Sequence, residues 1–374
     1  MKTKAAVLRE MGLSAPYAES RPLTVEELDL DPPGTGEVLV RIGAAGLCHS
    51  DLSVINGSRP RPMPMALGHE AAGEVVELGA GVDDLAVGDH VVMVFVPSCG
   101  HCLPCMEGRP ALCEPGAVGN GAGTLVSGAR RLHDASGPIH HHMGVSAFAE
   151  YAVCARPSLI KVDASLPLEE AALFGCAVLT GVGAVVNTAG VRPGTSVAVI
   201  GLGGVGLNAM LGAALAGAGR LVAIDLHDDK LALARQLGAT DAVSAADPDC
   251  ADKVREATHG GVDYAFEMAG SVKAMALAYG ITRRGGTTVT AGLPHPTHEF
   301  AIQQVGLVAE ERTVKGSYIG GCVPLRDVPR YIALYQQGKL PVDRLMSERV
   351  SFDDLNTAFD RLASGHTVRQ ILVP

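Results

Sequence analysis

A chain of 374 residues is longer than one hydrophobic core usually supports, so the sequence predicts two domains. Its composition, 47% hydrophobic and 19% charged with 46 glycines in no regular period, is globular and excludes collagen-like and low-complexity classes. The formal net charge of -10 argues against a nucleic-acid partner, because such proteins need clustered Lys and Arg to displace counterions from phosphates.

The N-terminus, MKTKAAVLRE, has no apolar segment of signal-peptide length before Arg9 and Glu10, which predicts a cytoplasmic protein. In that reducing compartment the nine cysteines favour metal binding or catalysis over disulfide formation. Two uncharged runs, 171–191 and 193–219, are long enough to suggest a membrane span, but several glycines interrupt both. We therefore expect these runs to lie in a buried core, and we expect no membrane partner.

The first part of the chain is typical of short strands separated by glycine-containing turns. The strand patterns are EVLVRIGAAG (37–46), EAAGEVVELG (70–79) and GDHVVMVFV (88–96). They predict a β-rich unit.

From Thr195 onward, apolar strand patterns alternate with helical patterns, beginning with SVAVIG, GLNAMLGAALAGAG, RLVAID and DDKLALARQLGA. This alternation predicts a parallel sheet with helices on both faces. The segment 312–321 is expected to be its sixth strand. Residues 351–365 form an amphipathic helical pattern with Asp353 and Asp354 near its start.

A dinucleotide site is predicted by VAVIGLGGVG, which carries Gly201, Gly203 and Gly206 between a strand and a helix. The first glycine permits the turn, the second lets the backbone approach a pyrophosphate, and the third lets the helix pack on the strand. Asp225 closes the next strand, where a carboxylate accepts hydrogen bonds from the ribose hydroxyls of NAD and repels the phosphate of NADP. The alternative is that Asp225 only caps a helix in a packing turn. The full spacing disfavours this alternative, so NAD is favoured over NADP.

Four cysteines, Cys99, Cys102, Cys105 and Cys113, lie in PSCGHCLPCMEGRPALC. Four thiolates in one short loop match a closed tetrahedral zinc site, which has no open position for chemistry. An iron–sulfur cluster and a disulfide pair are the alternatives, but the spacing fits neither common ferredoxin pattern. We predict structural zinc, with His101 a solvated spacer.

A second set is suggested by LCHSDLSV (47–54), ALGHEAAG (66–73) and LFGCAVLTG (173–181), which supply Cys48, His69 and Cys176. Two thiolates and one imidazole leave a fourth position open on zinc for an alcohol oxygen. Taken singly, each residue also fits a buried core position.

Together these motifs make the sequence resemble the zinc-dependent, medium-chain alcohol dehydrogenase family, from GEVLVRI through LCHSD, LGHEAAG and GLGGVG to FDRLASGHTVRQILV. The stretches IHHHMGVSAFAEY and GVGAVVNTAGVRPG are similar to the longer dimeric branch, near its class I and class III types. The resemblance implies an α/β protein. It also implies a GroES-like β-rich catalytic domain (1–177 and 319–374) and a Rossmann domain with a doubly wound parallel sheet that binds NAD (178–318).

By this resemblance Cys48, His69 and Cys176 hold the catalytic zinc, while Glu70 lies behind it and ligates transiently. Asp51 orients His69, and Ser50 contacts the substrate oxygen. The residues at positions that bind NAD in the family, with His49 and Arg369 near the pyrophosphate, are His49, Thr180, Gly201, Gly203, Gly204, Val205, Gly206, Asp225, Lys230 and Arg369.

The implied activity is NAD-linked oxidation of primary alcohols to aldehydes, and the reverse reduction, through a zinc alkoxide that transfers hydride to the nicotinamide. The proton leaves through Ser50 and the ribose hydroxyl. The best-known members place a histidine where this chain has Ser53. A serine relays a proton but does not store one near neutral pH, so the last step of the relay stays open.

The family positions that line the substrate cleft form a mostly apolar set, which favours an aromatic or medium-chain alcohol: Phe95, Val118, His142, Met143 and Leu293. His140, His141 and His142 do not predict a metal site, because consecutive residues on a strand alternate in direction.

An S-(hydroxymethyl)thiol (formaldehyde) dehydrogenase is the alternative enzyme. That branch holds its adduct with an arginine near position 117 and an acidic residue near position 59, where this chain has Ala117 and Arg59. A non-catalytic nucleotide-binding relative is the alternative from another class, and the complete ligand set weighs against it. The expected partners are a small alcohol or aldehyde and a second copy of the chain, as a homodimer or a homotetramer.

Overall fold

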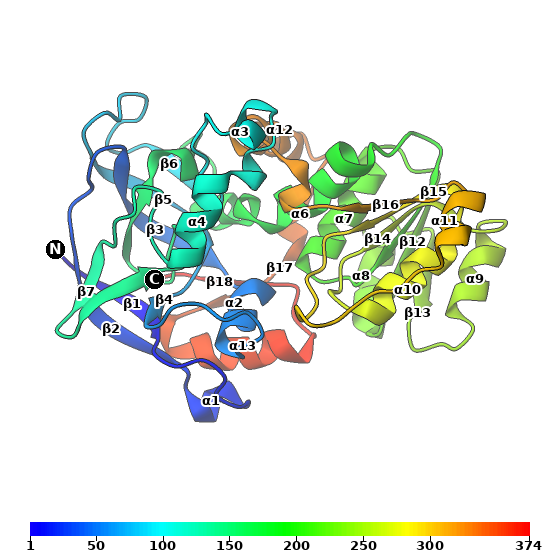
Figure 1. The fold of residues 1–374 in the computed structure, drawn as a ribbon, viewed down its shortest axis with the longest axis horizontal. Helices are drawn as coiled ribbons and strands as arrows, with labels where there is room; N and C mark the ends of the chain where they lie inside the picture. The colour runs from blue at the N-terminus through cyan, green and yellow to red at the C-terminus, as the bar shows by residue number, and fades with distance from the viewer. The chain divides into compact units, whose positions relative to one another are not determined.

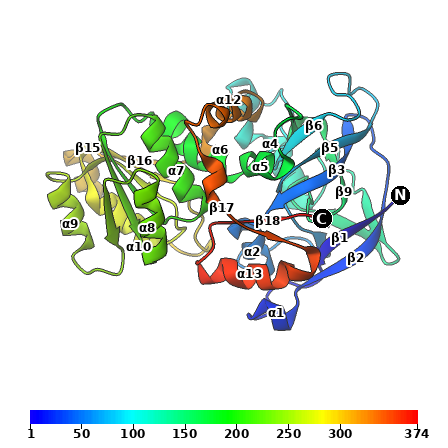
Figure 2. The same ribbon diagram turned by 180° about the vertical axis from the view of Figure 1, so that it is seen from behind.

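The chain forms two compact units, and a computed structural model describes residues 1–374 (Figure 1). The first unit comprises Met1–Cys176, Val323–Ile332 and Met346–Pro374. The second comprises Ala177–Cys322 and Ala333–Leu345. Each unit has its own sheets, as the view from behind also shows (Figure 2).

Three stretches fall in a different unit from the one expected, because Ala177, residues 319–322 and residues 333–345 all belong to the second unit. The longest, 333–345, was expected in the catalytic domain. Leu340, Val342 and Leu345 are buried, and the turn Val342–Leu345 packs against helix α7 (Gly204–Leu215). Burial of these three apolar side chains explains the assignment, and no motif in the segment signals it.

A closed barrel forms one part of the first unit, in the order β1-β2-β7-β8-β4. Alternating side chains from its strands fill a core that includes Val7, Leu28, Leu132 and Ile139. The barrel strands are β1 (Lys2–Leu8), β2 (Leu23–Leu30), β4 (Met65–Ala66), β7 (Leu132–Asp134) and β8 (Gly137–His141).

A seven-stranded sheet forms the other part, in the order β10-β6-β5-β3-β18-β17 with β9 paired to β3. The three strands expected over 37–46, 70–79 and 88–96 are present as β3, β5 and β6. The strands are β3 (Glu37–Gly46), β5 (Glu70–Leu78), β6 (His90–Val94), β9 (Tyr151–Ala155), β10 (Leu159–Val162), β17 (Met346–Val350) and β18 (Arg369–Leu372).

Short helices connect these strands. The helix expected over 351–365 is α13, which follows a 3-10 turn where Ser351 and Asp354 form a capping box. The helices of this unit are α1 (Tyr17–Ser20), α2 (His49–Ile55), α3 (Leu103–Met106), α4 (Glu114–Ala122), α5 (Leu168–Ala172) and α13 (Leu355–Ser364), with α12 (Pro324–Gln336) continuing into the second unit.

The second unit contains a six-stranded parallel sheet in the order β13-β12-β11-β14-β15-β16, with helices along it (Figures 1 and 2). The strands are β11 (Ser196–Ile200), β12 (Arg220–Asp225), β13 (Asp241–Ser244), β14 (Val262–Glu267), β15 (Thr282–Thr290) and β16 (Thr313–Gly316). The other helices are α6 (Ala177–Gly183), α8 (Asp228–Gln236), α9 (Cys250–Ala257), α10 (Val272–Ile281) and α11 (Gln304–Ala309).

The order of this sheet places β11 at its centre, beside β12 on one side and β14 on the other. The chain winds outward from β11 in both directions, so a crevice is expected where the loops after these strands diverge. The glycine-rich loop leaves from the end of β11, as the sequence predicts.

The uncharged runs contain no single helix long and apolar enough to cross a membrane. The bent pair Leu168–Gly175 and Ala177–Ala189 passes that test only jointly, on length and composition. Every residue of α6 is buried.

Candidate active site

Cys48 and His69 are brought together by the register of two neighbouring strands. Ala45 of β3 pairs with Ala71 of β5, so the residues that follow β3 and precede β5 lie at the same end of the sheet. Cys176 follows the 3-10 turn Leu173–Gly175, which packs against β5. The ligand atoms of Cys48, His69 and Cys176 all lie within 4.8 Å of one another, and the three side chains are buried.

Asp51 orients two of these groups from the first turn of α2. Its Oδ2 accepts a hydrogen bond from the backbone amide of Cys48 at 3.1 Å, as part of a capping box. Its Oδ1 accepts from Nδ1 of His69 at 3.0 Å. Burial opposes ionisation of Asp51, but the His69 and His142 imidazoles hold the pKa of its carboxyl well below the usual value. The carboxylate therefore fixes Nδ1 of His69 as a donor and leaves Nε2 to ligate.

The donor set fits a zinc ion. Nε2 of His69 is buried without a hydrogen-bond partner, in the cluster that contains both cysteine sulfurs. Cys176 and His69 lower the pKa of the Cys48 thiol well below its usual value, in spite of burial. Burial disfavours an imidazolium, yet Asp51 and Cys48 raise the pKa of His69 to about 10, so the site attracts positive charge. Two thiolates and an imidazole are a zinc set that leaves one position for substrate.

Glu70 and Arg369 form a buried ion pair beside this cluster. Glu70 begins β5 directly after His69, and its carboxylate contacts the guanidinium of Arg369, which begins β18. Arg369 also donates to the carbonyl of Leu47 at 3.4 Å. Although Arg369 was expected near the pyrophosphate, within its own unit it neutralises Glu70. Spacing alone gave no signal for this pairing.

The four cysteines of the loop form a second cluster, with all sulfurs within 4.8 Å of one another. Zinc at about 2.3 Å from four tetrahedral sulfurs places them about 3.8 Å apart, so the set fits that ion. Backbone amides support the sulfurs: Cys99 donates to Cys113 at 3.2 Å, and Cys102 donates to Cys99 at 3.3 Å.

None of the nine cysteines forms a disulfide. The thiols of the four-cysteine cluster differ from one another in pKa. The backbone amide of His101 lowers the pKa of Cys99 to about 6 against the effect of burial, whereas burial raises the pKa of Cys105 to about 12. A bound cation would bring all four to the thiolate form. The ring of His101 is exposed, and its Nδ1 lies 2.8 Å from the carbonyl of Cys99, so it takes no part in the cluster.

The predicted cleft residues of the first unit differ in their exposure and in the residues they contact. Phe95 is 6% exposed and packs edge-on against His69, with ring centroids 5.3 Å apart. Met143 is 8% exposed, but Val118 on α4 is 72% exposed. His142 is buried, and its Nδ1 lies 3.2 Å from Oδ1 of Asp51, without the alignment of a full hydrogen bond. His142 thus belongs to the surroundings of the ligands.

The three consecutive histidines point to different partners. Strand alternation accounts for His140 and His141, whereas His142 follows the end of β8. Nδ1 of His140 lies 2.9 Å from the carbonyl of Pro64. Nε2 of His141 accepts from the amide of Arg131 at 3.0 Å, and burial lowers the pKa of this imidazole to about 4. His142 alone faces Asp51.

The residues of the expected proton relay lie on α2. Ser50 occupies its first turn beside His49, next to Cys48, a predicted zinc ligand. The hydroxyl of Ser53 donates to the carbonyl of His49 at 2.8 Å, so it is held on its own helix.

In the second unit, the glycine loop between β11 and α7 has the features of a pyrophosphate site. Gly201 has a φ of 87°, and a side chain at Gly206 would collide with the carbonyl of Gly201. A side chain at Gly203 would enter open space, which leaves that face accessible to a ligand. No side chain caps the N-terminus of α7, where Gly204 and Val205 present backbone amides suited to phosphate.

Asp225 ends β12 next to this loop. Its Oδ2 accepts from the amide of Leu202 at 2.6 Å, and its Oδ1 accepts from the amide of His227 at 2.9 Å. These two hydrogen bonds hold the Asp225 carboxylate rigidly against the backbone of the loop it adjoins.

The other predicted residues of the second unit differ in exposure. Lys230 on α8 and Thr180 on α6 are buried, whereas Leu293 is 53% exposed.

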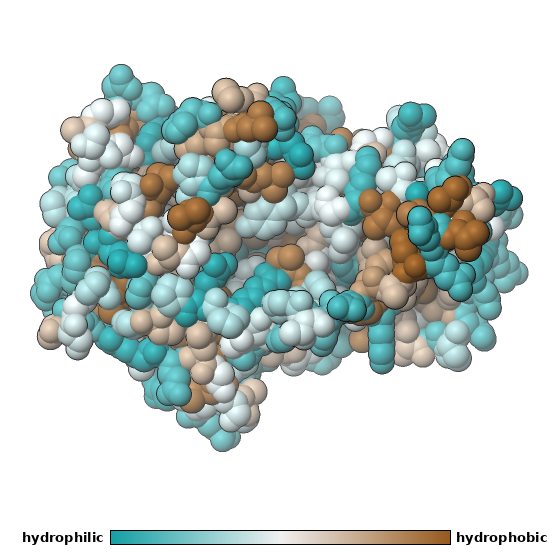
Figure 3. All heavy atoms as spheres, viewed as in Figure 1, coloured by the Kyte–Doolittle hydropathy of each residue, from teal (hydrophilic) through white to brown (hydrophobic).

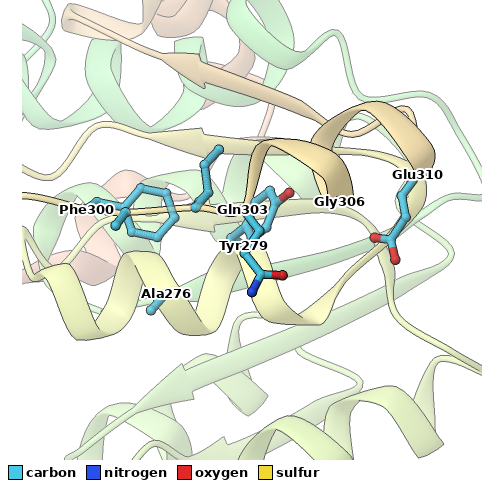
Figure 4. Close-up of a pocket in the computed structure, with 8 residues that line it drawn as sticks. Ala276, Tyr279, Phe300, Gln303, Gly306 and Glu310 are labelled. Atoms are coloured by element: carbon cyan, nitrogen blue, oxygen red, sulfur yellow. The ribbon is translucent and has the colours of Figure 1, made fainter.

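A surface hollow of about 320 Å³ lies elsewhere on the second unit, between α10 and α11 (Figure 4). Tyr279 and Phe300 line it, and Gln303 and Glu310 lie at α11. It contains no cluster of metal ligands and none of the predicted site residues.

Comparison with known proteins decides the family. Residues 34–164 match the alcohol dehydrogenase GroES-like domain, and residues 204–337 match the zinc-binding dehydrogenase domain. An alcohol dehydrogenase zinc-binding domain protein from Burkholderia ambifaria is 37% identical over 100% of this chain and 99% of its own, with a TM-score of 0.93. The chain belongs to the zinc-dependent medium-chain alcohol dehydrogenase family.

Two further structures place this alcohol dehydrogenase in its family. The benzyl alcohol dehydrogenase from Acinetobacter calcoaceticus is 32% identical over 100% of this chain and 99% of its own, with a TM-score of 0.93. A zinc-binding dehydrogenase from Sinorhizobium meliloti 1021, in a structure bound to NADP, is 27% identical over 100% of both chains, with a TM-score of 0.80. The predicted GroES-like and Rossmann folds are confirmed. By its family, this chain is a zinc-dependent oxidoreductase.

Proposed function

We propose that this alcohol dehydrogenase oxidises primary aromatic or medium-chain alcohols to aldehydes with NAD, and catalyses the reverse reduction, with two zinc ions per chain. The convergence of Cys48, His69 and Cys176 carries the proposal, because it combines three buried zinc ligands with a free ligand position. The second zinc belongs to the loop cysteines. A non-catalytic protein has no need of the open set.

When bound at the first set, zinc supplies a Lewis acid that lowers the pKa of an alcohol oxygen. The surrounding protein residues hold the zinc ligands in place and orient them. Asp51 keeps the proton of His69 on Nδ1, and the pair of Glu70 and Arg369 balances charge behind the ligands. We assign the first transfer of the alcohol proton to Oγ of Ser50. Phe95 presents an apolar ring beside His69 that excludes water.

The substrate class rests on the apolar side chains near the ligands. Phe95 and Met143 suit a hydrophobic ring or chain, and a thioether adapts its shape to different substrates. The likeness to a benzyl alcohol dehydrogenase over the whole chain supports the aromatic choice. Because Val118 is exposed and His142 faces Asp51, neither is assigned to substrate contact.

The thiol-adduct alternative is disfavoured by two residues. Ala117 carries no charge to hold a carboxylate of the adduct, and Arg59 would repel its amino group.

NAD is the proposed coenzyme because the Asp225 carboxylate stands at the end of β12, held by two backbone amides. In that place it favours free ribose hydroxyls and repels a phosphate.

We also propose a homodimer that works in the cytoplasm, with a homotetramer as the alternative assembly. The edge strand β16 has four exposed residues, and Val305 and Val308 of α11 are 73% and 70% exposed. Figure 3 shows apolar side chains gathered where Figure 1 places α11. An unpaired edge strand beside apolar side chains suits pairing with a second copy. Sedimentation equilibrium should give about twice 38.5 kDa, and Val305→Asp with Val308→Asp should give monomer.

The activity is tested by following NADH formation with benzyl alcohol, hexan-1-ol, ethanol and S-hydroxymethylglutathione. We expect kcat/KM for the first two to exceed that for ethanol by about tenfold or more, since each buried methylene contributes about 0.8 kcal/mol. Cys176→Ala should abolish turnover, whereas Cys250→Ala, at a core cysteine of the second unit, should retain it. Comparable efficiency with S-hydroxymethylglutathione would select the alternative enzyme. No turnover of any alcohol would select the non-catalytic reading.

A further inference from the structure

We propose that His142 is a positioning residue of the catalytic zinc site, which acts through Asp51 to hold His69 in the orientation that directs Nε2 of His69 toward the two cysteine sulfurs. The inference rests on the proposed zinc site. It assigns His142 a place behind the ligands rather than along the substrate.

The backbone of His142 is anchored in a tight turn after β8. Its amide donates to Oγ of Ser146 at 2.8 Å, and that hydroxyl donates to the carbonyl of Ala66 at 2.8 Å. The carbonyl of His142 accepts from the amides of Val145 and Ser146 at 3.0 and 3.2 Å. Ala66 belongs to β4, three residues before His69. The turn therefore fastens His142 to the segment that carries His69.

This turn also contains left-handed backbone conformations, which residues other than glycine rarely adopt. Met143 and Ser146 both have a φ of 52°. Such residues persist where surrounding contacts overdetermine them, and they cluster at functional sites. Ser146, fully buried, supplies those contacts through its hydroxyl.

The side chain of His142 meets the same oxygen that holds His69. Oδ1 of Asp51 lies 3.0 Å from Nδ1 of His69 and 3.2 Å from Nδ1 of His142. The two imidazole rings stand 86° apart with centroids at 5.4 Å. One oxygen thus serves two ring nitrogens, as the hydrogen-bond acceptor of His69 and as a close polar contact of His142.

A fully buried carboxylate is costly unless donors surround it. Asp51 is 0% exposed, and its carboxylate contacts the Cys48 amide, His69 and His142. Without His142, His69 alone would hold Oδ1, and the Cys48 amide alone would hold Oδ2, so the carboxylate would be less constrained. Since partners behind a ligating histidine set its ring orientation, the looser carboxylate would loosen the zinc ligand.

The test compares His142→Phe with His142→Asn in the zinc-loaded protein. Phenylalanine keeps a ring packed edge-on against His69 but has no donor. Asparagine places Nδ2 close to the position of Nδ1 of histidine and so restores the donor. The first measurement is the rate at which a chelator removes the catalytic zinc. The Cys176→Ala variant should lack this ion, so comparison with it identifies which of the two zinc ions is the catalytic one. The second is the visible spectrum of the cobalt-substituted protein, which reports ligand geometry.

We expect His142→Phe to lose the catalytic zinc about tenfold faster than wild type and to shift the cobalt bands. His142→Asn should remain close to wild type in both. Equal behaviour of His142→Phe and wild type would overturn the inference, and so would an asparagine variant as defective as the phenylalanine one. If Cys176→Ala held as much zinc as wild type, the proposed zinc site itself would fail, and the inference with it.

Discussion

The guanidinium of Arg369 lies against the carboxylate of Glu70, and the two side chains are 4% and 0% exposed. The pair joins the start of β18 to the start of β5, next to His69, a proposed zinc ligand. Two charges so removed from water depend on each other, because loss of one leaves the other buried and uncompensated.

Arg369→Met should therefore lower the free energy of unfolding by about 3–5 kcal/mol, measured by urea denaturation. The double variant Glu70→Gln with Arg369→Met should recover part of that loss. Arg330→Met removes an arginine that is 65% exposed, and serves as the control with little effect. Equal losses in Arg369→Met and Arg330→Met would contradict the dependence.

Elemental analysis should find two zinc ions per chain. Cys176→Ala should leave about one and keep the fold, because its zinc site serves chemistry. Cys113→Ala should lose stability as well as zinc, since a closed four-cysteine site contributes folding energy. Cys250→Ala should retain both ions. One zinc or none in active wild-type protein would reject the assignment.

Asp225→Gly should lower kcat/KM with NAD by about tenfold or more and improve the relative use of NADP. The carboxylate would no longer bind the ribose hydroxyls or repel a phosphate, and a charged hydrogen bond contributes about 1.5–3 kcal/mol. Asp228→Asn, at an exposed acid on the first turn of α8, is the matched control. Wild-type efficiency with NADP equal to that with NAD would refute the preference.

Acid sensitivity should follow from Glu37, whose carboxylate accepts from Arg131 Nε at 2.8 Å and Ser127 Oγ at 2.7 Å. Burial opposes ionisation, yet these donors and the amide of Gly34 lower the pKa of Glu37 below its usual value. A lowered folded-state pKa means that the contribution to stability is complete above the unfolded value of about 4.3. It is lost as pH falls through the folded value.

Glu37→Gln should consequently cost about 1–3 kcal/mol near neutral pH, and the difference from wild type should shrink below about pH 4. Urea denaturation across this range measures it. Glu77→Gln, at an exposed position on β5, should change little at any pH. A pH-independent cost for Glu37→Gln would argue against the linkage.

The proton relay can be probed at position 53. Wild-type turnover should show no ionisation from that position, because Ser53 does not titrate near neutral pH. Ser53→His should introduce an ionisation near about 6–7 in the pH profile of kcat. Ser53→Ala separates this gain from loss of the hydroxyl. An unchanged profile in Ser53→His would show that the proton leaves by another route.

The local sequence pattern was sufficient to predict the main strands, the parallel sheet and the compact motifs. Strand periodicity predicted β3, β5 and β6, and the alternation after Thr195 predicted the parallel sheet, because hydrophobic period follows directly from backbone geometry. The four cysteines of the loop and the glycines of the nucleotide turn are close in sequence. Their chain separation already limits how far apart they can lie, so their clustering was readable in advance.

Contacts between distant residues needed the tertiary structure. Arg369 lies far from Glu70 along the chain, and His142 far from Asp51, so only the packing of separate strands and turns brings each pair together. The same holds for 333–345, whose place in the second unit depends on which core buries Leu340 and Val342. Sequence by itself determined the strand and helix pattern, the four-cysteine loop and the glycine turn, since those features are local. The tertiary structure decided which buried charges and rings face one another, because a buried group is stabilised by whatever partner the fold places beside it.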